Sequence, residues 1–459
     1  MNIFTTFLDE ITIDQSFRMS PTYHNVSHNF KNAENCISLD NENIIVESGS
    51  YIKKYVSPEN GVPYLRVNNE KNYNIDESEM AYIEPGFKDK MKLKEFDVVF
   101  GRTQANLDKL GIFSLIDSKL DGVAISQHVS KIRIKNDLIS PYYLVAYLNS
   151  KFGKSQMAYA TYGDTRVELT HSQVKKIKII KIDSKLQNTV IENSKIIVKK
   201  NREALDSLKK AQDYILDKLS FKKNDNESTY NVNLSDLIEN DIWNVTNYKP
   251  EYISISRFIE EKTTWNLLSN LTELEIKSGC EVGSKNYLVE FEKNDNDYAF
   301  IRTSDIINNS VDMFPDYFVH ENVIPKNKFP KLKKYDILFS KDAKIGEVTI
   351  LNGEERIVPG SGFSIIRIDK NKVLPQYVFC VLSLELSKDQ ALQKTVIAST
   401  IPHLKINKLS KIKVPLLTID DQEYVAQLID NFILANKIKN EKIIENKKIM
   451  DSEYDKLFN

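Results

Sequence analysis

Four short stretches of the sequence are dense in side chains that donate and accept hydrogen bonds. They are "GRTQANLDKLG" (101–111), "TYGDTRVELTHSQVKK" (161–176), "SKDAKIG" (340–346) and "STIPHLK" (399–405). Arg, Lys, Asn, Gln, Ser and Thr are the residue types that hydrogen-bond to base edges in the major groove of DNA. The candidate DNA-binding residues are Arg102, Thr103, Gln104, Asn106, Lys109, Thr165, Arg166, His171, Lys175, Lys176, Lys341, Lys344, Ser399, Thr400, His403 and Lys405.

The candidates divide into two expected roles. Arg102 and Arg166 are expected to contact bases in the first half of the chain, because an arginine can engage guanine with two hydrogen bonds. Lys341, Lys344 and His403 take that role in the second half. The lysines expected in a strand just after the loop should contact phosphate instead: Lys175, Lys176, Lys411 and Lys413. Taken singly, each loop is better explained as a polar surface turn.

The four loops belong to a series of segments that occurs twice in the sequence. This repetition favours the hypothesis that the loops bind DNA over the hypothesis that they are four unrelated turns. The matching segments, in the same order in each half, are 62–69 with 298–305, 92–116 with 331–351, 130–156 with 363–390, and 162–180 with 397–417. "FDVVFG" and "YDILFS" are typical of strands. "SPYYLVAYLNSK" and "LPQYVFCVLSLEL" are typical of helices with proline in the first turn. Each half is therefore predicted to be a mixed α+β globule.

Each globule is followed by a stretch without proline or glycine whose apolar residues recur mostly at steps of seven, or of three and four. The predicted seam residues are Val190, Ile197, Ala204, Leu208, Ala211 and Ile215 in the first stretch, and Val425, Leu428, Phe432, Ala435, Ile443, Met450 and Leu457 in the second. Long helices with so narrow an apolar seam need a partner to bury it. An antiparallel pair of helices is favoured over helices that each pack on their own globule.

Composition excludes several classes of protein. A chain of 459 residues is too long for one core, and three distant cysteines make neither a metal knuckle nor a disulfide framework. No apolar run approaches the length of a membrane span, and no signal peptide is recognised, so a cytoplasmic location is expected. There is no Pro-Pro pair of the kind used by amino-methyltransferases and no phosphate-binding Gly-rich loop. The formal net charge of −1 counts mildly against a polyanionic partner.

The ordered motifs resemble the specificity subunits of type I restriction-modification enzymes. The resemblance is carried by "YLRVNN", "FDVVFGRT", "PYYLVAYLNS", "YGDTRVELTHSQVKKIKI" and "TIPHLKINKLSKIKVP", and by the order globule, long helix, globule, long helix. It implies two target recognition domains (1–182 and 223–417), each followed by a conserved spacer helix (183–222 and 418–459). It also implies a non-catalytic chain that reads a bipartite double-stranded DNA target.

The resemblance further implies the partners and cofactors. The chain would bind two methyltransferase subunits and, through them, restriction/translocase subunits, in a system of DNA methylation and phage defence. It would hold no cofactor itself, with S-adenosylmethionine, ATP and Mg²⁺ in the partner subunits and no metal site here. A specificity subunit of a type IIB-like enzyme, a self-contained DNA enzyme and a purely structural coiled-coil scaffold stay open as alternatives.

Overall fold

The computed structural model describes residue 30 and residues 36–458, except 72, 79, 105–110, 161–166, 222–230, 233, 241–242, 290–292, 295, 326–330 and 398–400. The chain forms two compact units. The first unit comprises residues 1–201 and 438–459, and the second unit comprises residues 202–437. None of the described helices is long and apolar enough to cross a membrane.

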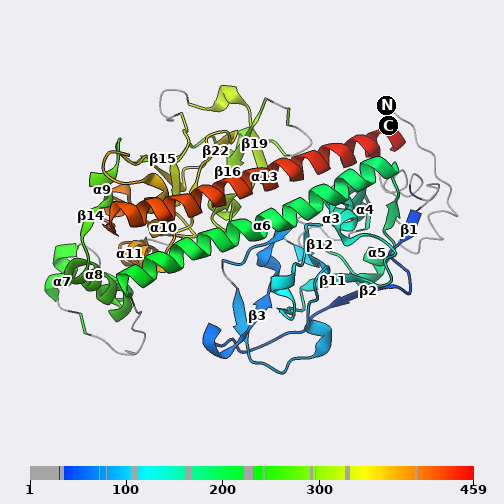
Figure 1. The fold of residues 1–459 in the computed structure, drawn as a ribbon, viewed down its shortest axis with the longest axis horizontal. Coiled ribbons are helices and arrows are strands. Elements are labelled where there is room, and N and C mark those ends of the chain that lie inside the picture. The colour runs from blue at the N-terminus through cyan, green and yellow to red at the C-terminus, as the bar shows by residue number, and fades with distance from the viewer. Residues whose placement is uncertain are drawn as a thin grey trace. The chain divides into compact units, whose positions relative to one another are not determined.

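The first unit contains a four-stranded antiparallel sheet in the order β2-β11-β7-β9 and a three-stranded sheet in the order β10-β3-β6. Figure 1 labels β2 and β11 of the first sheet and β3 of the second. Short two-stranded pairs are β1 with β13, β4 with β5, and β8 with β12. The strands are β1 (Cys36–Ser38), β2 (Ile44–Ser48), β3 (Val62–Leu65), β4 (Glu70–Lys71), β5 (Asn74–Ile75), β6 (Ala81–Ile83), β7 (Val98–Gly101), β8 (Thr103–Gln104), β9 (Phe113–Leu115), β10 (Ala124–Ile125), β11 (Val129–Ile134), β12 (Val167–Glu168) and β13 (Lys178–Ile180). The helices of its globule are α3 (Pro141–Asn149), α4 (Lys151–Ala160) and α5 (His171–Lys175).

The second unit repeats the strand order of the two main sheets. Its sheets run β15-β23-β20-β21 and β19-β16-β22, and β14 pairs with β26 as β1 pairs with β13. The strands are β14 (Trp265–Leu267), β15 (Lys277–Ser278), β16 (Tyr298–Ile301), β17 (Ile306–Ile307), β18 (Ser310–Val311), β19 (Tyr317–Val319), β20 (Ile337–Ser340), β21 (Val348–Ile350), β22 (Ile357–Pro359), β23 (Phe363–Ile366), β24 (Val396–Ile397), β25 (Pro402–His403) and β26 (Lys413–Pro415). The helices are α7 (Leu234–Asn240), α8 (Pro250–Lys262), α9 (Leu268–Leu271), α10 (Pro375–Leu382), α11 (Glu385–Gln393) and α12 (Ile406–Leu409). The predicted α+β class and the internal repeat are confirmed.

The repeat extends to individual side chains. In each unit an arginine donates two hydrogen bonds to a buried aspartate that precedes the neighbouring strand. Arg133 of β11 pairs with Asp97, and Arg367, which directly follows β23, pairs with Asp336. Both aspartates also accept a bond from the backbone N–H three residues earlier, at 2.9 and 2.8 Å. Bidentate, charge-assisted bonds of this kind fix orientation as well as adding energy. They hold the start of β7 and the start of β20 in the same place in each sheet.

A second repeated device ties α4 and α11 to the sheet strand behind them. Gln156 bonds both the N–H and the C=O of Lys178, and Gln390 bonds both groups of Lys413, at distances between 2.9 and 3.0 Å. One amide side chain thus bonds the backbone N–H and C=O groups that would otherwise have no partner at the edge of the strand. The strand that follows each candidate loop therefore has a fixed position.

Two long helices run through both units: α6 (Ser184–Leu219) and α13 (Ile419–Phe458). In the first unit, residues 184–201 and 438–458 lie antiparallel, with Val190, Ile197 and Met450 fully buried. Polar groups are buried beside them, since Asn446 Nδ2 donates to Ser194 Oγ at 3.0 Å and Lys439 Nζ donates to Asn201 Oδ1 at 3.2 Å. Buried polar pairs in a helical seam favour one register over its neighbours.

In the second unit the seam between residues 202–219 and 419–437 is mainly apolar, although Tyr214 Oη donates to Asp421 Oδ1 at 2.6 Å near its end. Ala204, Leu208, Ala211 and Ile215 join a core cluster with residues of α13, of α10 and of the sheet. On α13 the buried positions include the predicted Val425, Phe432 and Ala435, together with Ile429 and Ile433. The long helices are confirmed.

One seam prediction is wrong. Leu428 is partly buried and packs against the core cluster, as expected of a seam residue, but Leu457 is 54% exposed. It lies in the last turn of α13, where Tyr454 and Phe458 instead face Phe152 of the globule.

Candidate nucleic-acid interface

In the first unit, two of the predicted polar stretches come together beyond the end of β7. The chain leaves β7 at Gly101 and continues into β8, which pairs antiparallel with β12. The N–H of Leu169 donates to the C=O of Arg102 at 2.8 Å, and the N–H of Arg102 donates to the C=O of His128 at 2.8 Å. Three segments far apart in sequence are thereby fixed side by side.

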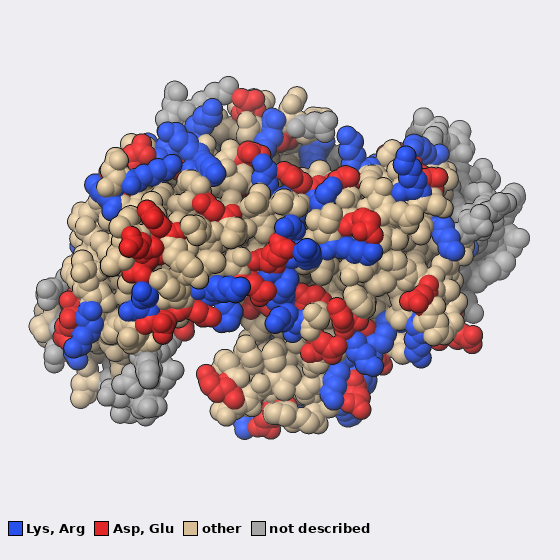
Figure 2. Space-filling model, in the orientation of Figure 1, with Lys and Arg blue, Asp and Glu red and all other residues tan. Residues whose placement is uncertain are grey.

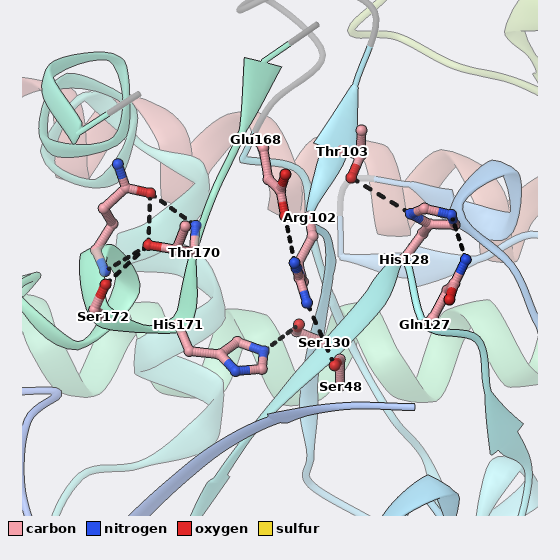
Figure 3. Close-up of polar contacts among 11 residues, drawn as sticks. Ser48, Arg102, Thr103, Gln127, His128, Ser130, Glu168, Thr170, His171 and Ser172 are labelled. Carbon is pink, nitrogen blue, oxygen red and sulfur yellow. Dashed lines mark hydrogen bonds and ion pairs between the residues drawn. The ribbon is translucent and has the colours of Figure 1, made fainter. Parts of the chain in front are cut away.

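The side chain of Arg102 lies between polar groups from two sides. Its guanidinium forms an ion pair with Glu168 of β12 and donates to Ser48 Oγ at 3.5 Å (Figure 3). The guanidinium is about one-quarter exposed and Glu168 about one-half. A partly exposed ion pair contributes little to stability, so Arg102 can exchange Glu168 for another acceptor at low cost. Glu168 was not among the sequence candidates.

Two histidines extend this polar surface. Thr103 Oγ1 lies 3.5 Å from His128 Nδ1, and Gln127 Nε2 lies 3.0 Å from His128 Nε2. His171, the first residue of α5, has its Nε2 3.0 Å from Ser130 Oγ (Figure 3). Burial, followed by the positive charge of Arg102, lowers the pKa of His171, which is therefore neutral at pH 7. The sequence reasoning missed Gln127 and His128, although the adjacent polar pair before β11 was a usable signal.

The position of two lysines differs from the prediction. Lys175 and Lys176 were expected in the strand after the loop, but Lys175 ends helix α5 and Lys176 caps it. Helix α5 begins at His171 because Thr170 and Gln173 form a capping box. Lys175 Nζ lies 3.5 Å from Asp40 Oδ1, and Lys176 is exposed. The strand begins only at Lys178.

The second unit joins the equivalent segments with the same backbone bond but different side chains. The N–H of Leu404 donates to the C=O of Lys341 at 2.8 Å, as Leu169 does to Arg102. Asp342 and His403 form an isolated bridge and an ion pair at this junction. Both side chains are partly exposed, the His403 imidazole by 46%.

The remaining described candidates of the second unit differ in exposure. Lys341 is only 8% exposed and lies 3.2 Å from Asp342 Oδ2, so its side chain is part of the interior and not of the surface. Lys344 is one-third exposed and pairs with Glu347 at 3.3 Å. Lys405 is exposed at the start of α12. Lys413 lies in β26 as expected, but its ammonium pairs with Glu260 of α8.

Seven candidates have no described side chain. Gln104 is placed in β8 by its backbone alone. Asn106, Lys109, Thr165, Arg166, Ser399 and Thr400 lie outside the described residues.

Surface charge agrees with the near-zero net charge of the chain. On the face drawn in Figure 2, Lys and Arg are interspersed with Asp and Glu. That face carries no broad single-sign field, so electrostatic attraction of a polyanion there must come from local groups. Among the described residues, no group of three or more His, Cys, Asp or Glu is arranged to hold a metal ion.

Comparison with known proteins identifies a family domain in part of the chain. Residues 269–447 match the family model of the type I restriction modification DNA specificity domain. No curated protein matches the chain in sequence. Solved structures similar to this chain include the S subunit of a type I restriction-modification system from M. genitalium, with 14% identity, 92% of this chain and 96% of that chain covered, and a TM-score of 0.36. The HsdS subunit from Thermoanaerobacter tengcongensis has 14% identity, coverage of 91% and 97%, and a TM-score of 0.28.

The family match is confined to residues 269–447. The matched residues contain most of the second unit, from α9 through β26 and along α13. The first unit repeats the same sheets, the same Arg–Asp pair and the same junction. The second unit therefore contains a type I restriction modification DNA specificity domain, and the first unit repeats its two main sheets.

Proposed function

We propose that each unit reads one half of a bipartite double-stranded DNA target through its junction. In the first unit the reading surface would include Arg102, Thr103 and His171. In the second unit it would include Lys344 and His403, with Lys405 beside them. Lys341 is left out because its side chain is buried.

One observation carries this proposal. The same backbone hydrogen bond joins the same two segments in both units, while the exposed ion pair at the junction differs: Arg102 with Glu168 in one, Asp342 with His403 in the other. A conserved frame with different polar side chains is what two readers of different base sequences require. Phosphate contacts position such a protein, and side chains at base edges give it specificity.

The long helices would set the distance between the two half-sites and bind the methyltransferase subunits. Two similar readers joined by a spacer contact half-sites at a fixed separation. In this proposal the recognition domains are residues 1–182 and 223–417, the spacer helices are 183–222 and 418–459, and the complex acts in the cytoplasm. The chain itself would be non-catalytic. Its sequence lacks the Pro-Pro and phosphate-loop motifs that the expected reactions use.

The test is to map methylated sites in DNA from cells that carry the chain and its methyltransferase partners. Arg102→Ala is expected to relax recognition of one half-site by about 1–3 kcal/mol per lost bidentate contact. Arg166→Ala should affect the same half, and His403→Ala should relax the other half alone. Lys372→Gln, a change of an exposed lysine paired with Asp369, serves as the control.

The outcomes separate the alternatives. If Arg102→Ala and His403→Ala both degrade the same half-site, the assignment of one reader to each unit is refuted. If purified chain without partners methylates or cleaves DNA in the presence of Mg²⁺ and S-adenosylmethionine, the non-catalytic role is refuted. Circular dichroism of each variant excludes loss of folding as the cause.

A further inference from the structure

The junction of the second unit contains a row of three interacting side chains. Lys341 Nζ lies 3.2 Å from Asp342 Oδ2, and the other oxygen of the same carboxylate, Oδ1, bonds Nδ1 of His403. The exposure of the side chains increases along this row, from the buried Lys341 through Asp342 to the His403 imidazole. The row therefore begins in the interior of the unit and ends at its surface.

The backbone fixes this row from both sides. The N–H of Leu404 donates to the C=O of Lys341 at 2.8 Å. The N–H of Ala343 donates to the C=O of Pro402 at 3.1 Å. Strand β25, which contains His403, also pairs with β24. A side chain on a backbone held in this way is preorganised, because little further ordering is required when it binds a ligand.

Asp342 determines which nitrogen of His403 is available to a ligand. A carboxylate only accepts hydrogen bonds, so the bonded Nδ1 must carry a proton. In a neutral imidazole the other nitrogen, Nε2, then has a lone pair and can only accept. Lys341 already balances the charge of Asp342, so no second positive charge is required at His403. Nε2 has no hydrogen-bond partner among the described residues.

We propose that His403 Nε2 accepts a hydrogen bond from the amino group of adenine or cytosine in the major groove, and that Asp342 positions the imidazole for this contact. The inference rests on the proposed function and names the chemical group that the second unit reads. Adenine N6 and cytosine N4 are the amino donors of the major groove, whereas guanine and thymine present only acceptors there.

The first unit presents the opposite chemistry in the same backbone frame. Arg102 occupies the position of Lys341, because each accepts the equivalent bond from a leucine N–H. The partly exposed guanidinium of Arg102 has donors only, and arginine reads the acceptors of guanine. The two junctions would therefore select different groups on the bases, a donor in the second half-site and an acceptor in the first.

The first experiment locates the contact on the DNA, with the full chain assembled with its methyltransferase subunits at pH 8, near the upper end of the range in which imidazoles ionise. His403→Phe should relax recognition of one base pair of the second half-site. Synthetic duplexes then lack the amino group of that pair, with purine replacing adenine or pyrimidinone replacing cytosine. The parent complex should lose affinity for such a duplex on the order of tenfold. His403→Phe should lose much less, since its contact is already absent, and any weakening of the base pair itself affects both complexes equally.

The second experiment tests the positioning role with Asp342→Asn. Lys341 can only donate, so it retains the amide oxygen, and the amide NH₂ then faces Nδ1 of His403. Nδ1 must accept in that arrangement, so the proton moves to Nε2 and the imidazole presents a donor. The variant should become insensitive to removal of the amino group and should favour an acceptor, as in guanine or thymine, on the strand that His403 contacts. Asp369→Asn removes the same charge from an acid that pairs with Lys372, and it should behave like the parent protein.

The outcomes separate this inference from the proposed function. If His403→Phe relaxes no position of the second half-site, the reading role proposed for the second junction is refuted. If it relaxes one position but removal of the amino group affects the parent and His403→Phe equally, the amino contact is refuted and the proposed function stands. If Asp342→Asn keeps the sensitivity of the parent to the amino group, or gains no preference for an acceptor, the positioning role is refuted.

A direct measurement decides the positioning role if Asp342→Asn does not fold. Nitrogen NMR of the histidine-labelled parent chain shows which imidazole nitrogen carries the proton, and the signal of His403 is assigned by its absence from His403→Phe. A proton on Nδ1 is expected, because Asp342 accepts from that atom. A neutral imidazole with its proton on Nε2 overturns the assignment.

Discussion

A buried carboxylate in the first unit leads to a prediction about stability. Glu70 in β4 is 4% exposed, and neither of its carboxylate oxygens has a hydrogen-bond partner among the residues that the structure describes. The corresponding residue of the second unit is Ile306, which follows the same capping turn and is also buried. Burial raises the pKa of Glu70 well above its ordinary value, and Lys71 offsets this only in part. The acid therefore occupies a position whose repeat partner is apolar.

The sign of the effect follows from the raised pKa. The folded state holds the proton more tightly than the unfolded state, so the stability is fully present below about pH 4.5 and is lost as the pH rises toward the folded pKa. Within that window the loss is at most about 1.4 kcal/mol per pH unit. Glu70→Ile removes this pH-dependent loss of stability. At pH 8 the variant should also gain the ~1–3 kcal/mol that an unpaired buried polar group costs, or more because the group is charged.

Denaturant unfolding at pH 5 and pH 8 measures this. Both tryptophans, Trp243 and Trp265, belong to the second unit, so their fluorescence reports on that unit and far-ultraviolet circular dichroism reports on both. We expect Glu70→Ile to shift the dichroism transition to higher denaturant at pH 8, to shift it less at pH 5, and to leave the tryptophan transition unchanged. The matched variant Ile306→Glu should destabilise the tryptophan transition instead. Equal stability of Glu70→Ile and the parent protein at pH 8 would refute the reasoning.

Two further perturbations test the frame that holds the junctions. Ile197→Lys or Phe432→Lys should lower the unfolding free energy by at least ~1.5–3 kcal/mol, because each buried apolar side chain contributes about that much. Each variant should also bind the methyltransferase subunits more weakly. Unchanged unfolding and assembly in both variants would contradict the burial of these two residues in the helical seam. Asp336→Asn should lower the midpoint of the tryptophan transition by the equivalent of ~3–5 kcal/mol, since Arg367 would lose its buried partner; a shift below 1 kcal/mol, about the value of an exposed pair, would show that the pair is not an anchor.

Several features of this protein were determined by local sequence alone. The period of the apolar residues placed Val190, Ile197 and Phe432 in helical seams, because a helix returns the same face inward at every second turn. The proline-led helices and the alternating strands were equally readable. The repeat needed no structure at all, since matching segments in the same order imply matching folds. The domain limits and the reading residues stay predictions.

What the sequence did not determine was which groups meet across the fold. Arg102 and Glu168 are brought together by the pairing of β8 with β12, and the facing of Asp342 and His403 depends on the bridge between their segments. The sequence could not show that the side chain of Lys341 is buried or that Lys175 belongs to a helix, because a single polar residue does not form a periodic pattern. The unpartnered state of Glu70 likewise depends on every neighbour in the packed core. Local periodicity decides which face of an element is buried, whereas the tertiary register decides which polar groups share that burial.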